Sequence, residues 1–439
     1  MAPSYTTITL TPGKADILET VCIVLEKHKD GDYYAYERED NWHIGIGCHS
    51  SLLVDSEGKT VTVCDGSIQK VFQVHGAIED FARTFASEHT KYGRKIFGQV
   101  GFNYAAHIRG IPYNAGKWPL LSMIVPHTEI SFHQEDITVK GFDGEKVREL
   151  CDFIERSASF RPPPSQAIDT QDETSSYIYR VSEALSEISH GMYTKVIPSR
   201  VVGLKERVNM PATLFHGRRS NNPKRSFSVC HTGFQATGFS PELVMSVENG
   251  KVVTEPLAGT RSCIGADIEE LCHELLNDPK EIVEHILSVK EAINELNQLC
   301  SADSIAVEDL MTVKRRGSVQ HLGSRVTGRL SFDKDVWDAF NIIFPSVTAS
   351  GIPKQAALEA IQRLESQPRE LYAGAVFILE DAKSFEAALV LRTVFQDRNR
   401  HWIQAGAGII SQSNPERELT ETSEKMASIA QFVVPETRL

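Results

Sequence analysis

Short apolar segments separated by polar turns run through the first 160 residues of the chain. Segments 51–54 and 60–63 flank the turn Ser-Glu-Gly-Lys, a pattern that predicts a β-hairpin. The pattern predicts further strands at 42–47, 97–102 and 120–126, and helical periodicity predicts helices at 78–89 and 144–157. We therefore expect residues 1–160 to be rich in strands, with few helices and no obvious chemistry.

Residues 161–176 interrupt this pattern, because three prolines followed by small polar residues cannot continue a helix or a central strand. We predict an exposed connection here, followed by a second region at 177–435. Its last three predicted strands follow one another closely, so they are expected to be antiparallel neighbours. The pattern predicts an α+β fold with large, mostly antiparallel sheets and helices outside them. The predicted helices are 177–189, 210–216, 268–276, 279–298, 334–343 and 352–367, and the strands 194–204, 225–230, 243–247, 324–330, 372–379, 385–395 and 401–410.

Composition narrows the class of protein. The 439 residues are 41% hydrophobic and 24% charged, which suits a globular protein with a large core. The net charge of −12, without a basic block, argues against nucleic acid or an anionic membrane as partner. Eight scattered cysteines without a C-x-x-C motif suggest free thiols in a reducing compartment. No secretory signal or membrane-length apolar run is visible, so we expect a soluble, cytoplasmic protein.

The most informative stretch lies near the C-terminus, where the apolar run 405–410 contains two glycines and a helix follows. Asn414 is a plausible N-cap and Pro415 fits the first helical position. Glu418, Glu421 and Lys425 fall at i, i+3 and i+7, so they share one helix face. This face is either solvated, as charged faces often are, or contributes to binding a metal ion and an anionic small molecule.

A second pair of carboxylates lies in the motif Asp278-Pro-Lys-Glu-Ile-Val-Glu-His. Asp278 and Pro279 mark a helix start, so Glu281 is either a capping-box residue or a metal ligand. Glu284 lies one turn further on the same face and has no capping role. Glutamates from two helices could together hold Mg²⁺, which prefers oxygen ligands and is commonly shared with an anionic substrate.

Four other residues are candidates for acid–base chemistry or anion binding. Lys195, at the start of an apolar strand, either extends to the surface or is desolvated and acts as a base. Glu242, at a turn into an apolar strand, would become a neutral acid if buried, and Glu255 competes for that role. Arg392, flanked by apolar residues on a predicted central strand, requires either a structural salt bridge or a bound carboxylate.

We expect two further residues, His321 and Thr348, to lie in loops of small residues, which would let a ligand approach closely. Each of them taken alone is typical of a structural position.

Together these motifs resemble the chorismate-utilising enzymes, and among them most closely the salicylate synthases. The resemblance covers about residues 177–435, and the N-terminal part matches more weakly. The motifs are Tyr-Thr-Lys-Val-Ile-Pro-Ser-Arg, Phe-Ser-Pro-Glu-Leu, Glu-Pro-Leu-Ala-Gly-Thr-Arg, Lys-Glu-Ile-Val-Glu-His, Gly-Ser-Val-Gln-His-Leu-Gly, Phe-Pro-Ser-Val-Thr-Ala-Ser-Gly-Ile-Pro, and Ala-Gly-Ala-Gly-Ile-Ile followed by Glu-Arg-Glu-Leu-Thr-Glu-Thr. Several blocks in the right order are far harder to obtain by chance than one motif.

The resemblance implies one large α+β fold, with 1–160 as its strand-rich N-terminal part and 177–435 as the chorismate-binding catalytic region. Two subdomains with packed antiparallel sheets would enclose the site in a cleft. The implied reaction converts chorismate through isochorismate into salicylate and pyruvate with Mg²⁺. The implied protein is a monomer, and its product is expected to supply a siderophore or a related aryl metabolite.

The resemblance also implies roles for individual residues. Lys195 would activate the water that attacks the ring, and Glu242 would protonate the departing hydroxyl. Glu284 and Glu421 would hold Mg²⁺, with Glu281 and Glu418 close to it. The remaining implied substrate-binding residues are Gly259, Thr260, His321, Thr348, Tyr372, Arg392, Gly406 and Lys425. Pro198 departs from a regular strand and suggests an edge or a bulge there.

Three alternative functions stay open. The nearest is an isochorismate synthase that stops before pyruvate elimination. An anthranilate- or aminodeoxychorismate-type synthase would use ammonia, which a water-activating Lys195 argues against. A non-catalytic chorismate-binding protein would have lost a key residue, but Lys195, Glu242, Glu284 and Glu421 are all present.

Overall fold

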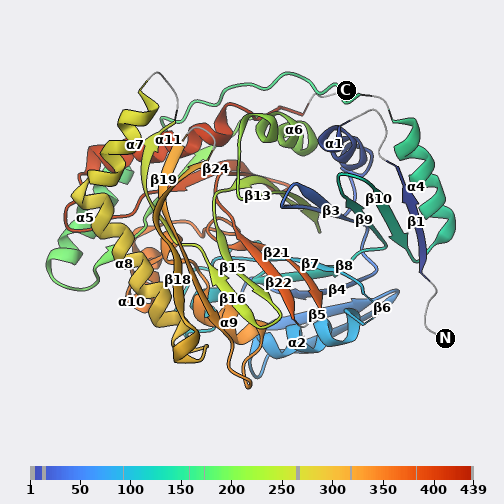
Figure 1. Ribbon diagram of the computed structural model, residues 1–439, viewed down its shortest axis with the longest axis horizontal. Coiled ribbons are helices and arrows are strands. Elements are labelled where there is room, and N and C mark those ends of the chain that lie inside the picture. Colours follow the sequence, from blue (N-terminus) through green and yellow to red (C-terminus); the bar gives the residue numbers. More distant parts are fainter. Residues whose placement is uncertain are drawn as a thin grey trace.

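The computed structural model describes residues 5–11, 16–91, 93–157, 159–172, 174–263, 267–316, 319–381 and 383–436. The architecture is α+β, as the pattern predicts, with two large sheets that pack face to face and helices outside them (Figure 1). The helices are α1 Ile17–Lys27, α2 Ile78–His89, α3 Tyr104–His107, α4 Gly144–Arg156, α5 Thr174–Ser189, α6 Met210–Ser220, α7 Ile268–Asn277, α8 Pro279–Leu296, α9 Val336–Ile343, α10 Lys354–Leu364 and α11 Pro415–Ala430.

The first sheet has ten strands in the order β1-β10-β9-β3-β2-β13-β14-β23-β24-β12, with every pair antiparallel. One face of this sheet packs on α1, α4, α6 and α11 through an apolar core. Its strands are β1 Thr6–Leu10, β2 Tyr33–Arg38, β3 Asn41–Ile46, β9 Thr128–Phe132, β10 Ile137–Gly141, β12 Ser199–Gly203, β13 Arg225–His231, β14 Phe234–Ser240, β23 Thr393–Gln396 and β24 His401–Gly406.

The second sheet has twelve strands, eleven of them in the order β17-β19-β16-β15-β22-β21-β7-β8-β4-β5-β6, with β18 also paired to β19. A third, two-stranded sheet joins β11 Lys195–Val196 to β20 Gly351–Ile352. The twelve strands are β4 Ser50–Val54, β5 Thr60–Asp65, β6 Ile68–Gln73, β7 Ile96–Val100, β8 Leu121–Val125, β15 Leu243–Glu248, β16 Lys251–Thr254, β17 Leu257–Ser262, β18 Ala306–Arg316, β19 Val319–Arg329, β21 Ala375–Asp381 and β22 Ser384–Leu389.

Both sheets contain strands from before and after the connection at 161–172, so the two parts of the chain share one core. Buried side chains cross between the sheets. Tyr36 of β2 donates a hydrogen bond to Glu386 of β22 at 2.9 Å, and Arg225 of β13 forms a bidentate ion pair with the same carboxylate. A buried arginine–carboxylate pair of this geometry fixes the relative position of the two sheets.

Two segments predicted as single strands each form two separate strands, so these two predictions are wrong. The segment 194–204 divides into β11 and β12 at Ile197-Pro198, and β12 lies at the edge of the ten-stranded sheet, where proline nearby is tolerated. The segment 385–395 divides into β22 and β23, which belong to different sheets. Arg392 therefore lies in a crossing segment with a φ of 51°, not on a central strand.

Other sequence predictions are confirmed. The hairpin of β4 and β5 forms, α2 covers the predicted range 78–89, and Pro279 and Pro415 begin α8 and α11 after the caps Asp278 and Asn414. All eight cysteines are free. No helix in the described part of the chain combines the length and apolar character needed to cross a membrane.

Candidate active site

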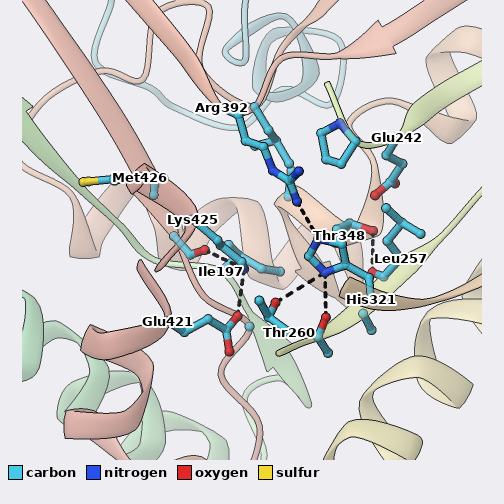
Figure 2. Close-up of a pocket in the computed structure, with 18 of the residues that line it drawn as sticks. Ile197, Glu242, Leu257, Thr260, His321, Thr348, Arg392, Glu421, Lys425 and Met426 are labelled. Atoms are coloured by element: carbon cyan, nitrogen blue, oxygen red, sulfur yellow. Dashed lines mark hydrogen bonds and ion pairs between the residues drawn. The ribbon is translucent and has the colours of Figure 1, made fainter. Parts of the chain in front are cut away.

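One cavity lies where segments cross between the two large sheets, and it contains most of the residues singled out in the sequence (Figure 2). Eleven of the fourteen predicted site residues line it, and the other three, Lys195, Glu281 and Glu418, are buried but do not line it. The eleven are Glu242, Gly259, Thr260, Glu284, His321, Thr348, Tyr372, Arg392, Gly406, Glu421 and Lys425.

The two sheet-crossing segments explain why residues so distant in sequence meet. One segment connects β14 to β15 and carries Glu242, while the other connects β22 to β23 and carries Arg392. Backbone hydrogen bonds tie the segments together, from Leu389 N to Glu242 O at 3.1 Å and from Phe239 N to Arg392 O at 3.2 Å. An acidic and a basic side chain are thereby held in one cavity by main-chain geometry.

Glu242 is 1% exposed, and its two carboxyl oxygens differ in their surroundings. Oε1 accepts a hydrogen bond from Ser346 Oγ at 2.5 Å, whereas Oε2 has no hydrogen-bond partner among the described residues. Burial raises the pKa of Glu242 to about 8, although the hydroxyls of Ser346 and Thr348 and the Lys195 ammonium oppose that rise. Glu242 is therefore a neutral acid at pH 7 and can donate a proton inside the cavity.

The competing acid, Glu255, does not line the cavity. Its carboxylate pairs with Lys224 at 2.9 Å. The structure thus favours Glu242 over Glu255 as the acid.

Arg392 is 6% exposed and forms no ion pair with a carboxylate within the described ranges, so the structural salt bridge considered for it is absent there. Nη1 donates to Arg316 O at 2.8 Å, and Nη2 contacts His321 Nε2 at 2.5 Å. Burial, together with Arg316, lowers the pKa of Arg392 to about 9. A buried cation without a carboxylate partner inside a cavity is suited to an anionic ligand.

His321 lies in β19, so the prediction of a loop there is wrong. Its ring orients the Arg392 guanidinium through a defined tautomer. A guanidinium can only donate, so Nε2 of His321 accepts, and Nδ1 carries the proton and donates to Gly259 O at 2.7 Å. Burial and the nearby Arg392 charge lower the pKa of His321 to about 3, which keeps the ring neutral. Gly259 has a φ of +71°, and a Cβ there would lie 2.8 Å from Glu281 Oε2, so glycine is required.

A second cation, Lys425, faces the same cavity from α11. Its Nζ pairs with Glu421 Oε1 at 2.8 Å and donates to Gly406 O at 3.0 Å. Tyr372, which is 2% exposed, also lines this wall. Arg392 and Lys425 therefore give the cavity two positive groups for binding a carboxylate (Figure 2).

Lys195 is 1% exposed, so it does not extend to the surface. Its Nζ contacts Glu284 Oε1 at 3.0 Å and donates to Ser288 Oγ at 3.0 Å. Gly408 and Glu284 both line the cavity, and a Cβ at Gly408 would lie 2.3 Å from Glu284 Oε1 and 3.2 Å from Lys195 Cε. The absence of a side chain at Gly408 therefore leaves room for this ion pair beside the cavity.

Four glutamates from α8 and α11 converge beside the cavity. Glu281, Glu284, Glu418 and Glu421 are 3%, 6%, 1% and 5% exposed, so the alternative of a solvated face for Glu418 and Glu421 is wrong. The capping-box alternative for Glu281 is also wrong, because its carboxylate faces Arg261 at 3.2 Å and no reciprocal bond to the N-cap backbone forms.

The ionisation of the four glutamates is uneven. Burial alone would raise the pKa of all four, but Lys195 and Lys280 hold the pKa of Glu284 below its ordinary value. Lys425 and Lys280 likewise lower the pKa of Glu421 to about 2. Burial and the neighbouring Glu421 charge raise the pKa of Glu418 to about 7, and burial raises the pKa of Glu281. The cluster thus combines charged and partly protonated carboxyls.

This cluster has the chemistry of a Mg²⁺ site, with carboxylate oxygens from two helices next to an anion-binding cavity. Oε2 of Glu281 and Oε2 of Glu418 are buried and have no hydrogen-bond partner in the described part of the chain. As the side chains stand, no group of three or more acidic, histidine or cysteine side chains among the described residues could hold a metal ion. The Lys280 ammonium accounts for the lack of such a metal-binding group, because it lies 3.3 Å from Glu284 Oε2 and 3.3 Å from Glu418 Oε1.

Three polar residues of this site carried no assigned role in the sequence. Lys280 lies in the same motif as Glu281 and Glu284, and its position next to these carboxylates could have indicated that it belongs to the site. Ser346 contacts the Glu242 carboxyl, and Ser288 contacts Lys195. Nothing in the sequence marks either serine, because their partners lie 104 and 93 residues away.

Comparison with known proteins agrees with this class of site. Residues 31–431 match the family of chorismate binding enzymes, and the chain belongs to that family. Solved structures have the same fold. Anthranilate synthase component I from Streptococcus pneumoniae aligns with a TM-score of 0.77 at 23% identity, and the alignment covers 90% of this chain and 92% of that one. The menaquinone-specific isochorismate synthase from Escherichia coli aligns with a TM-score of 0.71 at 21% identity, covering 98% and 95%.

Curated relatives are more similar in sequence. A salicylate synthase from Mycolicibacterium paratuberculosis is 35% identical over 430 residues, which covers 96% of this chain and 94% of the relative. Anthranilate synthase component 1 from Methanothermobacter marburgensis is 29% identical, covering 88% and 85%. The chain is thus a chorismate-utilising enzyme, and enzymes of this family typically use Mg²⁺.

Proposed function

We propose that this enzyme is a salicylate synthase, which converts chorismate into isochorismate and then eliminates pyruvate to release salicylate. The salicylate synthase relative supports this choice, since the similarity extends over nearly the whole of both chains. The observation that carries the first step is a buried, protonated Glu242 in the cavity, together with a buried Lys195 that contacts the cavity residue Glu284.

In the first step, water adds to the ring and a hydroxyl leaves from another ring carbon. Lys195 is assigned as the base that takes a proton from the water attacking at C2. Glu242 donates its proton to the departing C4 hydroxyl, which leaves as water. Oε2 of Glu242 has no hydrogen-bond partner among the described residues, so it is available for this transfer. Ser346 holds the other oxygen of Glu242 in place.

The substrate carboxylates need two different binding groups. Arg392, Lys425, Tyr372 and the backbone at Gly406 are assigned to the enolpyruvyl carboxylate, because they line the cavity and two of them bring positive charge to it. Mg²⁺, held by Glu284 and Glu421 with Glu281 and Glu418 close by, would neutralise and anchor the ring carboxylate when bound.

The second step requires the enolpyruvyl group to lie close to the ring hydrogen that it receives. Such an intramolecular transfer depends on confinement more than on another catalytic group. Gly259, Thr260, His321 and Thr348 line the cavity and are assigned to shaping it. The Thr348 hydroxyl donates to Leu257 O at 3.1 Å, which positions that part of the wall.

Incubation of the purified enzyme with chorismate and Mg²⁺ tests this proposal, with salicylate followed by its fluorescence. Salicylate and pyruvate should form in equal amounts. Accumulation of isochorismate without salicylate would identify an isochorismate synthase instead. An amine product that forms only when ammonium is added would identify the anthranilate type, which several relatives represent.

The variant Lys195→Ala tests the proposed role of Lys195 as the base, independently of the family to which the enzyme belongs. The variant should lose turnover of chorismate, while Lys290→Ala, at an exposed position of α8, should retain it. Turnover by Lys195→Ala at the wild-type rate would exclude Lys195 as the base. We also propose that the enzyme is a monomer, which light scattering of the purified protein would check.

A further inference from the structure

The side chain of Lys280 occupies the centre of the glutamate cluster. Its ammonium lies 3.3 Å from Glu284 Oε2, 3.3 Å from Glu418 Oε1 and 3.6 Å from Glu281 Oε1. Two of these carboxylates come from α8 and one from α11, so Lys280 bridges the two helices. Of these carboxylates, Glu284 is a proposed metal ligand, and Glu281 and Glu418 are the two expected close to the metal, so Lys280 occupies the region where the cation would bind.

The other cations around the cluster have narrower roles. Lys195 pairs with Glu284, and Lys425 pairs with Glu421. Arg261 pairs with Glu281 at 3.2 Å but is also held by Asp278 at 2.5 Å. Among the described residues, Lys280 is the cation that contacts three of the four glutamates.

We propose that the Lys280 ammonium stands in for the divalent cation when the metal is absent, and that it must leave the cluster before Mg²⁺ binds. This inference rests on the proposed metal site. Without the Lys280 charge or a metal ion, the charged carboxyls of this buried cluster would repel one another more strongly, because their charges are poorly screened away from water. Lys280 relieves this repulsion in the metal-free protein and thereby competes with Mg²⁺.

The position of Lys280 allows such an exchange. It lies in the first turn of α8, directly after Pro279, and its side chain is 18% exposed, whereas those of Glu281 and Glu418 are 4% and 1% exposed. A lysine side chain has four flexible carbons, so the ammonium can turn toward water while the backbone of α8 stays in place. No helix movement is required for the metal to enter.

Replacement of Lys280 by methionine removes the charge and keeps most of the side-chain volume. Isothermal titration with Mg²⁺ alone, without chorismate, should show tighter binding to Lys280→Met than to the wild type. If Lys280 occupies the metal position for about nine-tenths of the time, the affinity should rise about tenfold. Lys280→Arg, which keeps the charge, should bind Mg²⁺ no more tightly than the wild type.

Thermal unfolding supplies a second readout that does not depend on catalysis. Without Mg²⁺, Lys280→Met should melt at a lower temperature than the wild type, and Mg²⁺ should raise its melting temperature by more. Lys290→Met is the matched control, because Lys290 lies on the same helix at an exposed position away from the glutamates, and it should match the wild type in both measurements. If Lys280→Met does not fold, Lys280→Gln replaces it.

Equal or weaker Mg²⁺ binding by Lys280→Met, or the absence of Mg²⁺ binding in both proteins, would overturn the inference. This result is distinct from a failure of the proposed function. An enzyme that makes isochorismate or an amine product would refute the salicylate synthase assignment, yet its Lys280 could still exchange with Mg²⁺.

Discussion

Replacement of Glu242 by glutamine should abolish catalysis and make the folded protein less sensitive to alkaline pH. Glutamine has nearly the same shape as the protonated glutamic acid, and its Oε1 can still accept the hydrogen bond from Ser346. It cannot donate a proton to a leaving hydroxyl. Loss of a general acid typically lowers the rate by about 10²–10⁴-fold.

The effect on stability follows from the pKa of Glu242, which burial raises from 4.5 to about 8. Between these two pH values the folded protein keeps the proton that the unfolded chain releases, so the free energy of unfolding falls as the pH rises. At about 1.4 kcal/mol per pKa unit, the loss is roughly 1 kcal/mol at pH 5 and roughly 4.5 kcal/mol at pH 8, where the folded carboxyl is half ionised. Glu242→Gln does not titrate and escapes this loss.

The wild type should therefore lose roughly 4 kcal/mol relative to Glu242→Gln between pH 5 and pH 8. With an unfolding entropy of about 2.1 cal/mol/K per residue, this difference changes the melting temperature by about 4 °C for 439 residues. Differential scanning calorimetry of both proteins at pH 5 and pH 8, at one scan rate, measures it. Circular dichroism checks that the variant is folded.

Glu255→Gln is the matched control, because Glu255 lies outside the cavity and pairs with Lys224. It should keep its activity, and its melting temperature relative to the wild type should not change with pH. A difference between Glu242→Gln and the wild type that is the same at pH 5 and pH 8 would refute the assignment of a buried neutral acid. Wild-type turnover by Glu242→Gln would refute its role as the proton donor.

Three further predictions concern the same site. Wild-type turnover should fall as the pH rises through about 8, where Glu242 loses its proton, and a pH–rate profile that continues to rise above pH 9 would contradict this acid. Glu421→Gln should lower the Mg²⁺-dependent rate by more than about 100-fold with an unchanged circular dichroism spectrum, whereas Glu416→Gln, at an exposed position of α11, should not. Gly408→Ala should fold but lose most of its activity, because its methyl group would lie 2.3 Å from Glu284 Oε1 and disturb the buried ion pair with Lys195. Gly203→Ala is the control, because a methyl group at Gly203 would meet open space, and it should stay active. Full activity of Gly408→Ala would show that this ion pair does not need to face the cavity.

Much of the secondary structure was determined by the sequence alone, because it depends on local chemistry. Asp278 and Asn414 cap α8 and α11 as predicted, since a side-chain oxygen, a proline and the following amides are all neighbours in the chain. The strand at 385–395 was predicted incorrectly, because apolar alternation does not report which sheet a residue joins. The chain changes sheets between β22 and β23, and Arg392 lies at that change.

For the candidate site too, some features could be predicted from local sequence and others depended on tertiary structure. The motifs identified Glu281, Glu284, Glu418 and Glu421 as pairs on two helices, but charged residues at helical spacing fit a solvated face equally well. Tertiary structure decided between these alternatives, because it buries all four and places the Lys280 ammonium against three of them. The protonated state of Glu242 was likewise decided by the packed sheets, since desolvation arises from atoms brought in from distant parts of the chain. The sequence by itself determined which chemical groups are available, and only the tertiary structure decided their contacts and charges.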